Sequence, residues 1–207
     1  AYQSVWNGGN ANNGTDIGIM KFSPNGPQRV YATYIGGNYN DYPHSLFCDP
    51  QGNLVVMGRS YSSNYPGTII GTAAASDVSN IIVTKLNATG TALIGSLSIG
   101  GSGNDGVNIK DLQRFQDHGS ASLVRNYGDD SRSEVILDGA NNIYIAAQTM
   151  SKDFPVKNAF QNTIGGAQDG VVMKIDPSCN NLIWATFLGG TADDGAFVLD
   201  INPTSGE

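Results

Sequence analysis

The chain has few of the residues that catalysis, metal binding and nucleic-acid binding most often use. Its 207 residues include two cysteines and two histidines, and 11 basic against 18 acidic side chains leave a formal charge of −7. Nucleic acid and anionic membrane surfaces both select for an excess of lysine and arginine, so neither is expected as a partner. The apolar runs are too short to span a bilayer, and two cysteines are too few for a disulfide scaffold.

The composition instead favours an all-β protein. Glycine accounts for 27 residues and asparagine for 21, and both are typical of tight turns. Valine, isoleucine and tyrosine are well represented, as in strands, and a hydrophobic content of 40% is too high for a disordered chain. The sequence begins Ala-Tyr-Gln without an initiator methionine, and we expect it to be part of a longer protein.

Internal repeats are the strongest signal in the sequence. A motif that ends in Gly-Gly occurs at residues 34–37, 98–101 and 187–190. Other landmarks recur in the same order: an aspartate-rich turn followed by an apolar run, an aromatic–proline pair, and a strand-like segment that contains a lysine. Even Ala1-Tyr2-Gln3 has a counterpart in residues 159–161. Four short strands repeated with a period above forty residues predict the blades of a β-propeller.

Each repeat resolves into four strands joined by polar turns, which we designate A to D. In the first complete unit they are predicted at 44–49, 53–59, 80–86 and 92–99, and in the second at 133–138, 142–148, 170–175 and 182–188. Strands C and D at 16–22 and 29–35 precede these units, and a strand A at 196–201 follows them. The predicted fold is therefore all-β, a propeller segment with just under three four-stranded antiparallel blades.

The predicted strands divide the chain into four parts. Residues 1–35 form the second half of a blade, 36–99 a complete blade, 100–188 a second complete blade, and 189–207 the start of another. The second complete blade is longer by about 25 residues, which we expect near 105–129, between strand D of one blade and strand A of the next.

Four sequence features together resemble a known repeat family. They are the stretch TYIGGNYND at 33–41, the Asp49–Asn53 turn followed by Leu-Val-Val, the motif Asn64-Tyr-Pro66, and the stretch IVTKLN at 82–87. The chain resembles the SBBP repeat, the seven-bladed β-propeller repeat of bacterial secreted and surface proteins, over nearly its whole length. The resemblance implies a propeller in an exported bacterial protein, at the cell surface or outside the cell. It implies nothing about an activity, because blade-building residues define the family.

Oxygen-rich turns provide the only candidate metal ligands. Four aspartates lie in such turns and are weak candidates for calcium: Asp41, Asp105, Asp130 and Asp194. Asp41 lies eight residues before the aspartate of the A–B turn, and Asp130 has the same spacing from Asp138. None of the turns completes a known calcium loop, so we expect these carboxylates to accept hydrogen bonds from loop amides instead. No other cofactor is predicted.

The two histidines and two cysteines suggest no catalytic centre. His44 and His118 occupy unrelated repeat positions, and we interpret both as solvated or turn residues. Cys48 lies in an apolar strand, where a buried free thiol is expected, and Cys179 lies in a turn of a different blade. Both are predicted to stay unpaired, since a disulfide needs Cα atoms within about 7 Å.

Function is expected on the side of the B–C and D–A connections, which are long and variable. Within the insertion, four non-repeated residues are the candidates for partner contact: Phe115, Tyr127, Arg114 and Arg125. Tyr65 and Phe154 occupy equivalent positions and are expected to pack on their own blades. We therefore predict a non-catalytic scaffold or binding segment that contacts protein or glycan and packs against further blades of the same protein. The alternative is the propeller part of a secreted hydrolase or lyase whose catalytic residues lie elsewhere.

Overall fold

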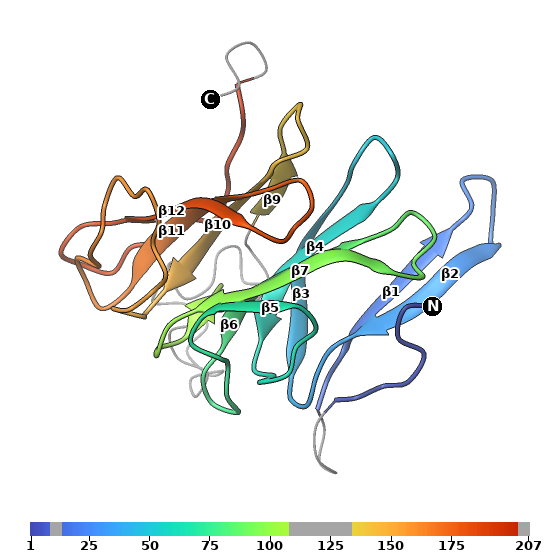
Figure 1. The fold of residues 1–207 in the computed structure, drawn as a ribbon, viewed down its shortest axis with the longest axis horizontal. Coiled ribbons are helices and arrows are strands. Elements are labelled where there is room, and N and C mark those ends of the chain that lie inside the picture. Colours follow the sequence, from blue (N-terminus) through green and yellow to red (C-terminus); the bar gives the residue numbers. More distant parts are fainter. Residues whose placement is uncertain (9–13, 108–133, 203–207) are drawn as a thin grey trace, which may run out of the picture.

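The structure, a computed structural model, describes residues 1–8, 14–107 and 134–202. Within these ranges the chain is all-β, as predicted, with several sheets, none of them closed (Figure 1). The strands are β1 (Ile17–Phe22), β2 (Arg29–Ile35), β3 (Asp41–Cys48), β4 (Leu54–Ser60), β5 (Thr68–Gly71), β6 (Asn80–Leu86), β7 (Leu93–Gly100), β8 (Asp105–Gly106), β9 (Glu134–Leu137), β10 (Ile143–Thr149), β11 (Asp169–Ile175) and β12 (Leu182–Leu188).

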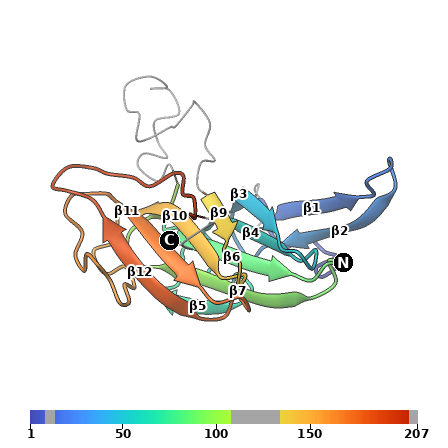
Figure 2. The same cartoon turned by 90° about the horizontal axis from the view of Figure 1, so that it is seen from above.

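These strands form three sheets, which we call units 1, 2 and 3. Unit 1 is the β1–β2 hairpin, unit 2 is the sheet β3-β4-β6-β7 with β5 at its outer edge, and unit 3 is the sheet β9-β10-β11-β12 with β8 beside β10. Neighbouring strands are antiparallel except β5 and β7. Seen from above, the three sheets lie side by side in chain order (Figure 2). The predicted strands A to D of units 2 and 3 thus occur in the predicted order.

Polar turns fix the register between the first two strands of units 2 and 3. The Oδ1 atom of Asp49 accepts hydrogen bonds from the backbone amides of Gln51 at 3.0 Å and Asn53 at 2.8 Å. Asp138 makes the same pair of bonds in unit 3, at 2.9 and 2.8 Å. The residue two positions before the second strand is left-handed in both turns, with φ of +81° at Gly52 and +63° at Asn141. Equivalent turns therefore give equivalent strand pairs.

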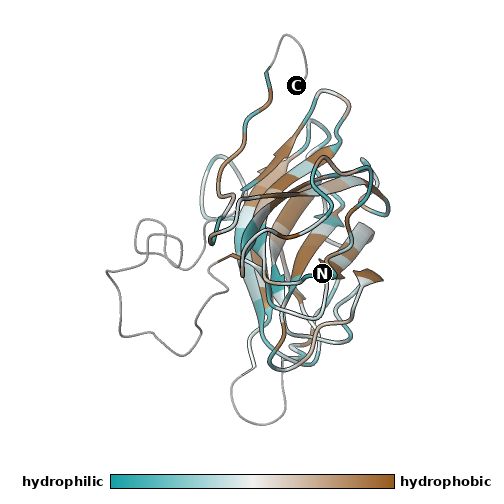
Figure 3. Cartoon of the chain, turned by 90° about the vertical axis from the view of Figure 1, so that its left-hand side faces the viewer, coloured by the Kyte–Doolittle hydropathy of each residue, from teal (hydrophilic) through white to brown (hydrophobic). Residues whose placement is uncertain are grey.

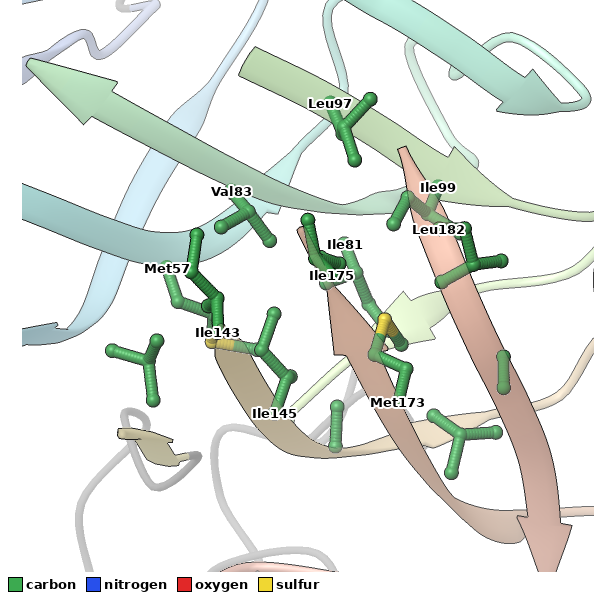
Figure 4. Close-up of a cluster of buried hydrophobic side chains, with 14 of the residues drawn as sticks. Met57, Ile81, Val83, Leu97, Ile99, Ile143, Ile145, Met173, Ile175 and Leu182 are labelled. Atoms are coloured by element: carbon green, nitrogen blue, oxygen red, sulfur yellow. The ribbon is translucent and has the colours of Figure 1, made fainter. Parts of the chain in front are cut away.

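A hydrophobic core fills the space between units 2 and 3. Alternate residues of β4, β6 and β7 face those of β10, β11 and β12, and Figure 4 shows their side chains meeting between the two sheets. Met57, Ile81, Ile143 and Met173 in this core are fully buried. A smaller cluster, which includes Ile17, joins units 1 and 2. Figure 3 shows apolar residues, in brown, along the strands of the sheets.

Three features of the fold differ from the prediction. Residues 196–201 form no strand, because no described strand pairs with them; the Leu199 amide instead donates a 2.9 Å hydrogen bond to Glu134 Oε2 of unit 3. Conversely, β5 arises inside the loop expected between strands B and C. It pairs in parallel with the outer edge of β7, whose backbone groups would otherwise lack partners.

The position of the insertion is the third difference. Both β8 and β9 pair with β10: Asp105 lies opposite Thr149, and Glu134 lies opposite Ala146. In unit 2 the single strand β3 pairs with β4 along the whole length that β8 and β9 together cover on β10, and Asp41 lies opposite Ser60. The extra residues therefore follow Val107 and separate β8 from β9, the two strands of unit 3 that pair with the same side of β10. The prediction had placed them between the last strand of unit 2 and the first strand of unit 3, and this position was wrong.

Candidate functional site

A buried aspartate ties each unit to the loop that precedes it. Asp41 Oδ2 accepts hydrogen bonds from the Gly37 amide at 2.8 Å and the Ser62 hydroxyl at 3.0 Å, and its Oδ1 accepts a short one from Ser60 Oγ. The side of Gly36 lies against the carboxylates of Asp16 and Asp41, where no larger residue would fit. The geometry of the Gly36–Gly37 loop thus depends on this carboxylate.

Unit 3 repeats the same arrangement around Asp105. Its Oδ2 accepts hydrogen bonds from the Gly101 amide at 2.8 Å and from Ser151 Oγ at 2.9 Å, and its Oδ1 accepts a short one from Thr149 Oγ1. The structural counterpart of Asp41 is therefore Asp105. Spacing from the A–B turn had indicated Asp130 instead. The spacing misleads because the insertion lies between Asp105 and the turn at Asp138. Asp130 itself lies outside the described residues.

Asp194 repeats the contact a third time. Its Oδ2 accepts a 2.6 Å hydrogen bond from the Gly190 amide, although here the pair is exposed. The predicted role of Asp41, Asp105 and Asp194 as acceptors for loop amides is thus confirmed. In the part of the chain that the structure describes, no three acidic, histidine or cysteine side chains gather in a way that would hold a metal ion.

Burial raises the pKa of the two enclosed aspartates. The pKa of Asp41 rises to about 6 and that of Asp105 to about 7, in both cases mainly because the surrounding protein desolvates the carboxylate. Hydrogen bonds from the serine, threonine and glycine donors oppose this rise. Two buried carboxyl groups that titrate near neutral pH therefore lie at the junctions between units.

A cation–aromatic cluster lies where the insertion leaves unit 3. The Arg59 side chain is 7% exposed, and its Nη1 atom donates a 2.9 Å hydrogen bond to the carbonyl of Val107, the last described residue before the insertion. The guanidinium lies 5.2 Å from the centre of the Tyr42 ring. Tyr61 meets Tyr42 edge to face, with ring centres 6.3 Å apart. These side chains hold Val107, the residue before the insertion, against unit 2.

This cluster occurs only once among the described units. Position by position, unit 3 has Gln148 where unit 2 has Arg59, Gly106 where it has Tyr42, and Met150 where it has Tyr61. Sequence reasoning missed the cluster, although its signal was present: an arginine and two aromatic residues at repeat positions that otherwise hold small or neutral residues.

The four predicted contact residues, Phe115, Tyr127, Arg114 and Arg125, lie outside the described residues, as does His118. Tyr65 and Phe154 are buried, 4% and 3% exposed, and each packs on its own unit, as predicted: the Tyr65 hydroxyl lies 2.9 Å from Thr84 Oγ1, and Phe154 meets Phe187 edge to face. Both also belong to the clusters that join their units to the preceding one. His44 is half-buried in β3, and its Nδ1 atom is shielded from solvent. Burial, with a smaller contribution from Arg59, lowers its pKa to about 3, so the imidazole is neutral.

Both cysteines are free, as predicted. The prediction that Cys48 is buried was wrong, and the burial of Cys179 was not predicted. Cys48 is exposed at the end of β3, an edge strand, and it lines an open groove of about 640 Å³ between β1 and β3. Cys179 is fully buried, and its thiol lies 3.4 Å from the carbonyl oxygen of Val83 in unit 2. Burial raises the pKa of Cys179 to about 12.

No protein-family model matches the chain, and no curated protein matches it either. None of the described residues belongs to a helix of the length and apolar character needed to cross a bilayer.

Proposed function

We propose that the chain is a non-catalytic binding segment that presents residues 108–133 from a rigid β scaffold to a protein or glycan partner. The observation that carries this proposal is the Arg59 hydrogen bond to the Val107 carbonyl, with the two tyrosines packed beside it. A buried arginine is costly to desolvate and is retained where it fixes a geometry. Here it fixes the start of a segment that the repeat itself does not need.

The architecture supports the same proposal. Equivalent four-stranded sheets that lie side by side are what a β-propeller requires, and we propose that units 1 to 3 are blades of one. In this arrangement Tyr42, Arg59 and Val107 lie on the side of the B–C and D–A connections, where the long loops gather. The SBBP-like repeats favour an exported bacterial protein, at the cell surface or secreted, in which further blades of the same protein are the structural partners.

The test exchanges the insertion for its counterpart in unit 2. There a single residue, His44, joins Pro43 to Ser45, the equivalents of Val107 and Glu134. Replacing residues 108–133 by one histidine therefore preserves the register of β10. Wild type and the exchange variant are applied to a glycan microarray and to a phage-displayed peptide library. We expect ligands that bind wild type with micromolar or tighter affinity and lose at least tenfold in affinity for the exchange variant.

A control variant separates this outcome from general damage. Gln51→Arg alters an exposed residue of the A–B turn, on the opposite side of the strands. It is expected to bind as wild type does, and the exchange variant is expected to keep the wild-type circular dichroism spectrum. Binding that survives the exchange and disappears with Gln51→Arg would overturn the proposed site. Turnover of a glycan or peptide by the isolated chain would overturn the non-catalytic role.

A further inference from the structure

Units 1 and 3 each expose one face of their sheet. The equivalent residues of other units in the chain are buried against a neighbouring unit. In unit 1 the open face consists of four large side chains that are 41–64% exposed: Met20, Phe22, Val30 and Tyr34. Three of them correspond to residues of unit 3 that are fully buried against unit 2, namely Met173, Ile175 and Phe187. We call this set of four the unit 1 open face.

Unit 3 exposes the opposite side of the repeat. Leu188 is 52% exposed, whereas its counterparts Ile35 and Ile99 are fully buried between units. Phe160 is 90% exposed, whereas its counterpart Tyr2 packs against the cluster between units 1 and 2. Together with Lys174 and Trp184 on the same side, they form what we call the unit 3 open face.

A lysine contact recurs at each junction between units. Lys21 of unit 1 donates a 3.3 Å hydrogen bond to the Ala88 carbonyl in the β6–β7 turn. Lys85 of unit 2 donates a 3.0 Å bond to the Pro177 carbonyl, at the same place in the β11–β12 turn. Lys174 is the third member of this series. It lies 3.4 Å from Asp138, as Lys85 lies 3.0 Å from Asp49, so the ion pair that accompanies the contact of Lys85 is repeated at Lys174.

Side-chain size at these junctions is also matched. Tyr31 of unit 1 packs on Gly90, the left-handed residue of the next turn, where any side chain would overlap the ring. In the following junction the sizes are reversed: Gly95 takes the place of Tyr31, and the larger Cys179 takes the place of Gly90. Trp184 is the third residue of the Tyr31 series, so its partner turn must carry a glycine.

The β1–β2 turn of this chain meets both requirements. It reads Ser23-Pro24-Asn25-Gly26, so the carbonyl of Pro24 takes the place of Ala88 and Pro177, and Gly26 takes the place of Gly90. The side of Gly26 is open, with nothing within 4 Å of the position that a Cβ atom would take. This turn adjoins the unit 1 open face, whose apolar side chains match Leu188 and Phe160.

We propose that, in the 207-residue chain by itself, the unit 3 open face binds the unit 1 open face of a second copy, in the place that further blades of the same protein take under the proposed function. Lys174 would then donate to the Pro24 carbonyl of that copy, and Trp184 would cover its Gly26. Such a contact is heterologous, because different surfaces of the two copies meet, and it propagates head to tail. It needs only the β1–β2 hairpin from the second copy, which is complete in the described residues.

The experiment blocks one face at a time. Met20→Lys with Val30→Lys places charge on the unit 1 open face, and Phe160→Asp with Leu188→Asp does so on the unit 3 open face; all four residues are more than half exposed, so folding is expected to survive. Sedimentation velocity is recorded for wild type, each double variant and their equimolar mixture, between 1 and about 300 µM. We expect concentration-dependent assembly of wild type, monomers of each variant alone, and a dimer in the mixture.

A single substitution tests the recurring lysine contact. Lys174→Met removes the donor and keeps an apolar side chain of similar length, and we expect it to weaken assembly about tenfold or more, the effect of losing a charged hydrogen bond. Gln51→Arg, remote from both faces, is the matched control and should assemble as wild type. A monomeric wild type at the highest concentration would overturn the proposal. So would dimers of either double variant alone, or a mixture that stays monomeric while circular dichroism shows both variants folded.

Discussion

Removing Asp105 is expected to destabilise the chain far more than removing its counterpart Asp194. Asp105→Ala leaves the buried Gly101 amide and Thr149 hydroxyl without an acceptor, whereas Ser151 Oγ keeps an alternative acceptor in the Gly103 carbonyl, 3.1 Å away. Each orphaned buried donor costs about 1–3 kcal/mol. The expected loss of unfolding free energy is therefore about 2–6 kcal/mol.

Asp194→Ala removes one exposed hydrogen bond, from the Gly190 amide, and is expected to cost only about 0.5–1.5 kcal/mol. Both variants and wild type are unfolded in urea at pH 7 and followed by tryptophan fluorescence and circular dichroism at one protein concentration. Asp105→Asn is the conservative comparison, because its amide oxygen can still accept from Gly101. Equal costs for the two alanine variants, within about 0.5 kcal/mol, would refute the role assigned to the buried carboxylate.

Three further predictions follow from the same contacts. Burial raises the folded-state pKa of Asp41 to about 6 and that of Asp105 to about 7, above the value of about 3.9 in an unfolded chain. The free energy of unfolding should therefore fall, on the order of 1–3 kcal/mol, as the pH rises from 5 to 8. In urea titrations the double variant Asp41→Asn with Asp105→Asn should show a flatter dependence on pH. Gly90→Cys should cost about 2 kcal/mol or more, since it meets the Tyr31 ring at a left-handed position, and Tyr31→Gly should recover part of this loss; additive costs in the double-mutant cycle would contradict the packing described. Iodoacetamide should alkylate Cys48 but not Cys179 in the native chain and both in denaturant, as read by intact mass, and rapid native labelling at both sites would be inconsistent with a buried Cys179.

The sequence allowed the strands to be predicted because its turns are specific. Aspartate at the start of the A–B turn and a left-handed glycine or asparagine near its end leave little freedom in where β4 and β10 begin. The alternation of apolar residues then decides which side of each strand is buried. Ten of the eleven predicted strands therefore have a counterpart in the structure, and the exception, 196–201, lacks a partner strand.

The candidate site was harder to predict because spacing along the chain does not reveal where an insertion interrupts a strand. Counting back from Asp138 leads to Asp130, whereas hydrogen bonding to the Gly-Gly loop and pairing with Thr149 identify Asp105 as the counterpart of Asp41. The Arg59 contact with Val107 joins residues 48 positions apart and depends on the packing of units 2 and 3. Neither contact has a local pattern that could be recognised before the sheets are assembled.

Hydrogen exchange of the chain with a bound ligand tests the proposed function most directly. The ligand is a glycan or peptide selected on wild type as described above, and exchange is compared with and without it. We expect protection to concentrate at Tyr42, at 59–61 and from Val107 into the insertion, with the turns at 50–52 and 87–91 unchanged. Protection confined to those turns, with Val107 unaffected, would contradict the account.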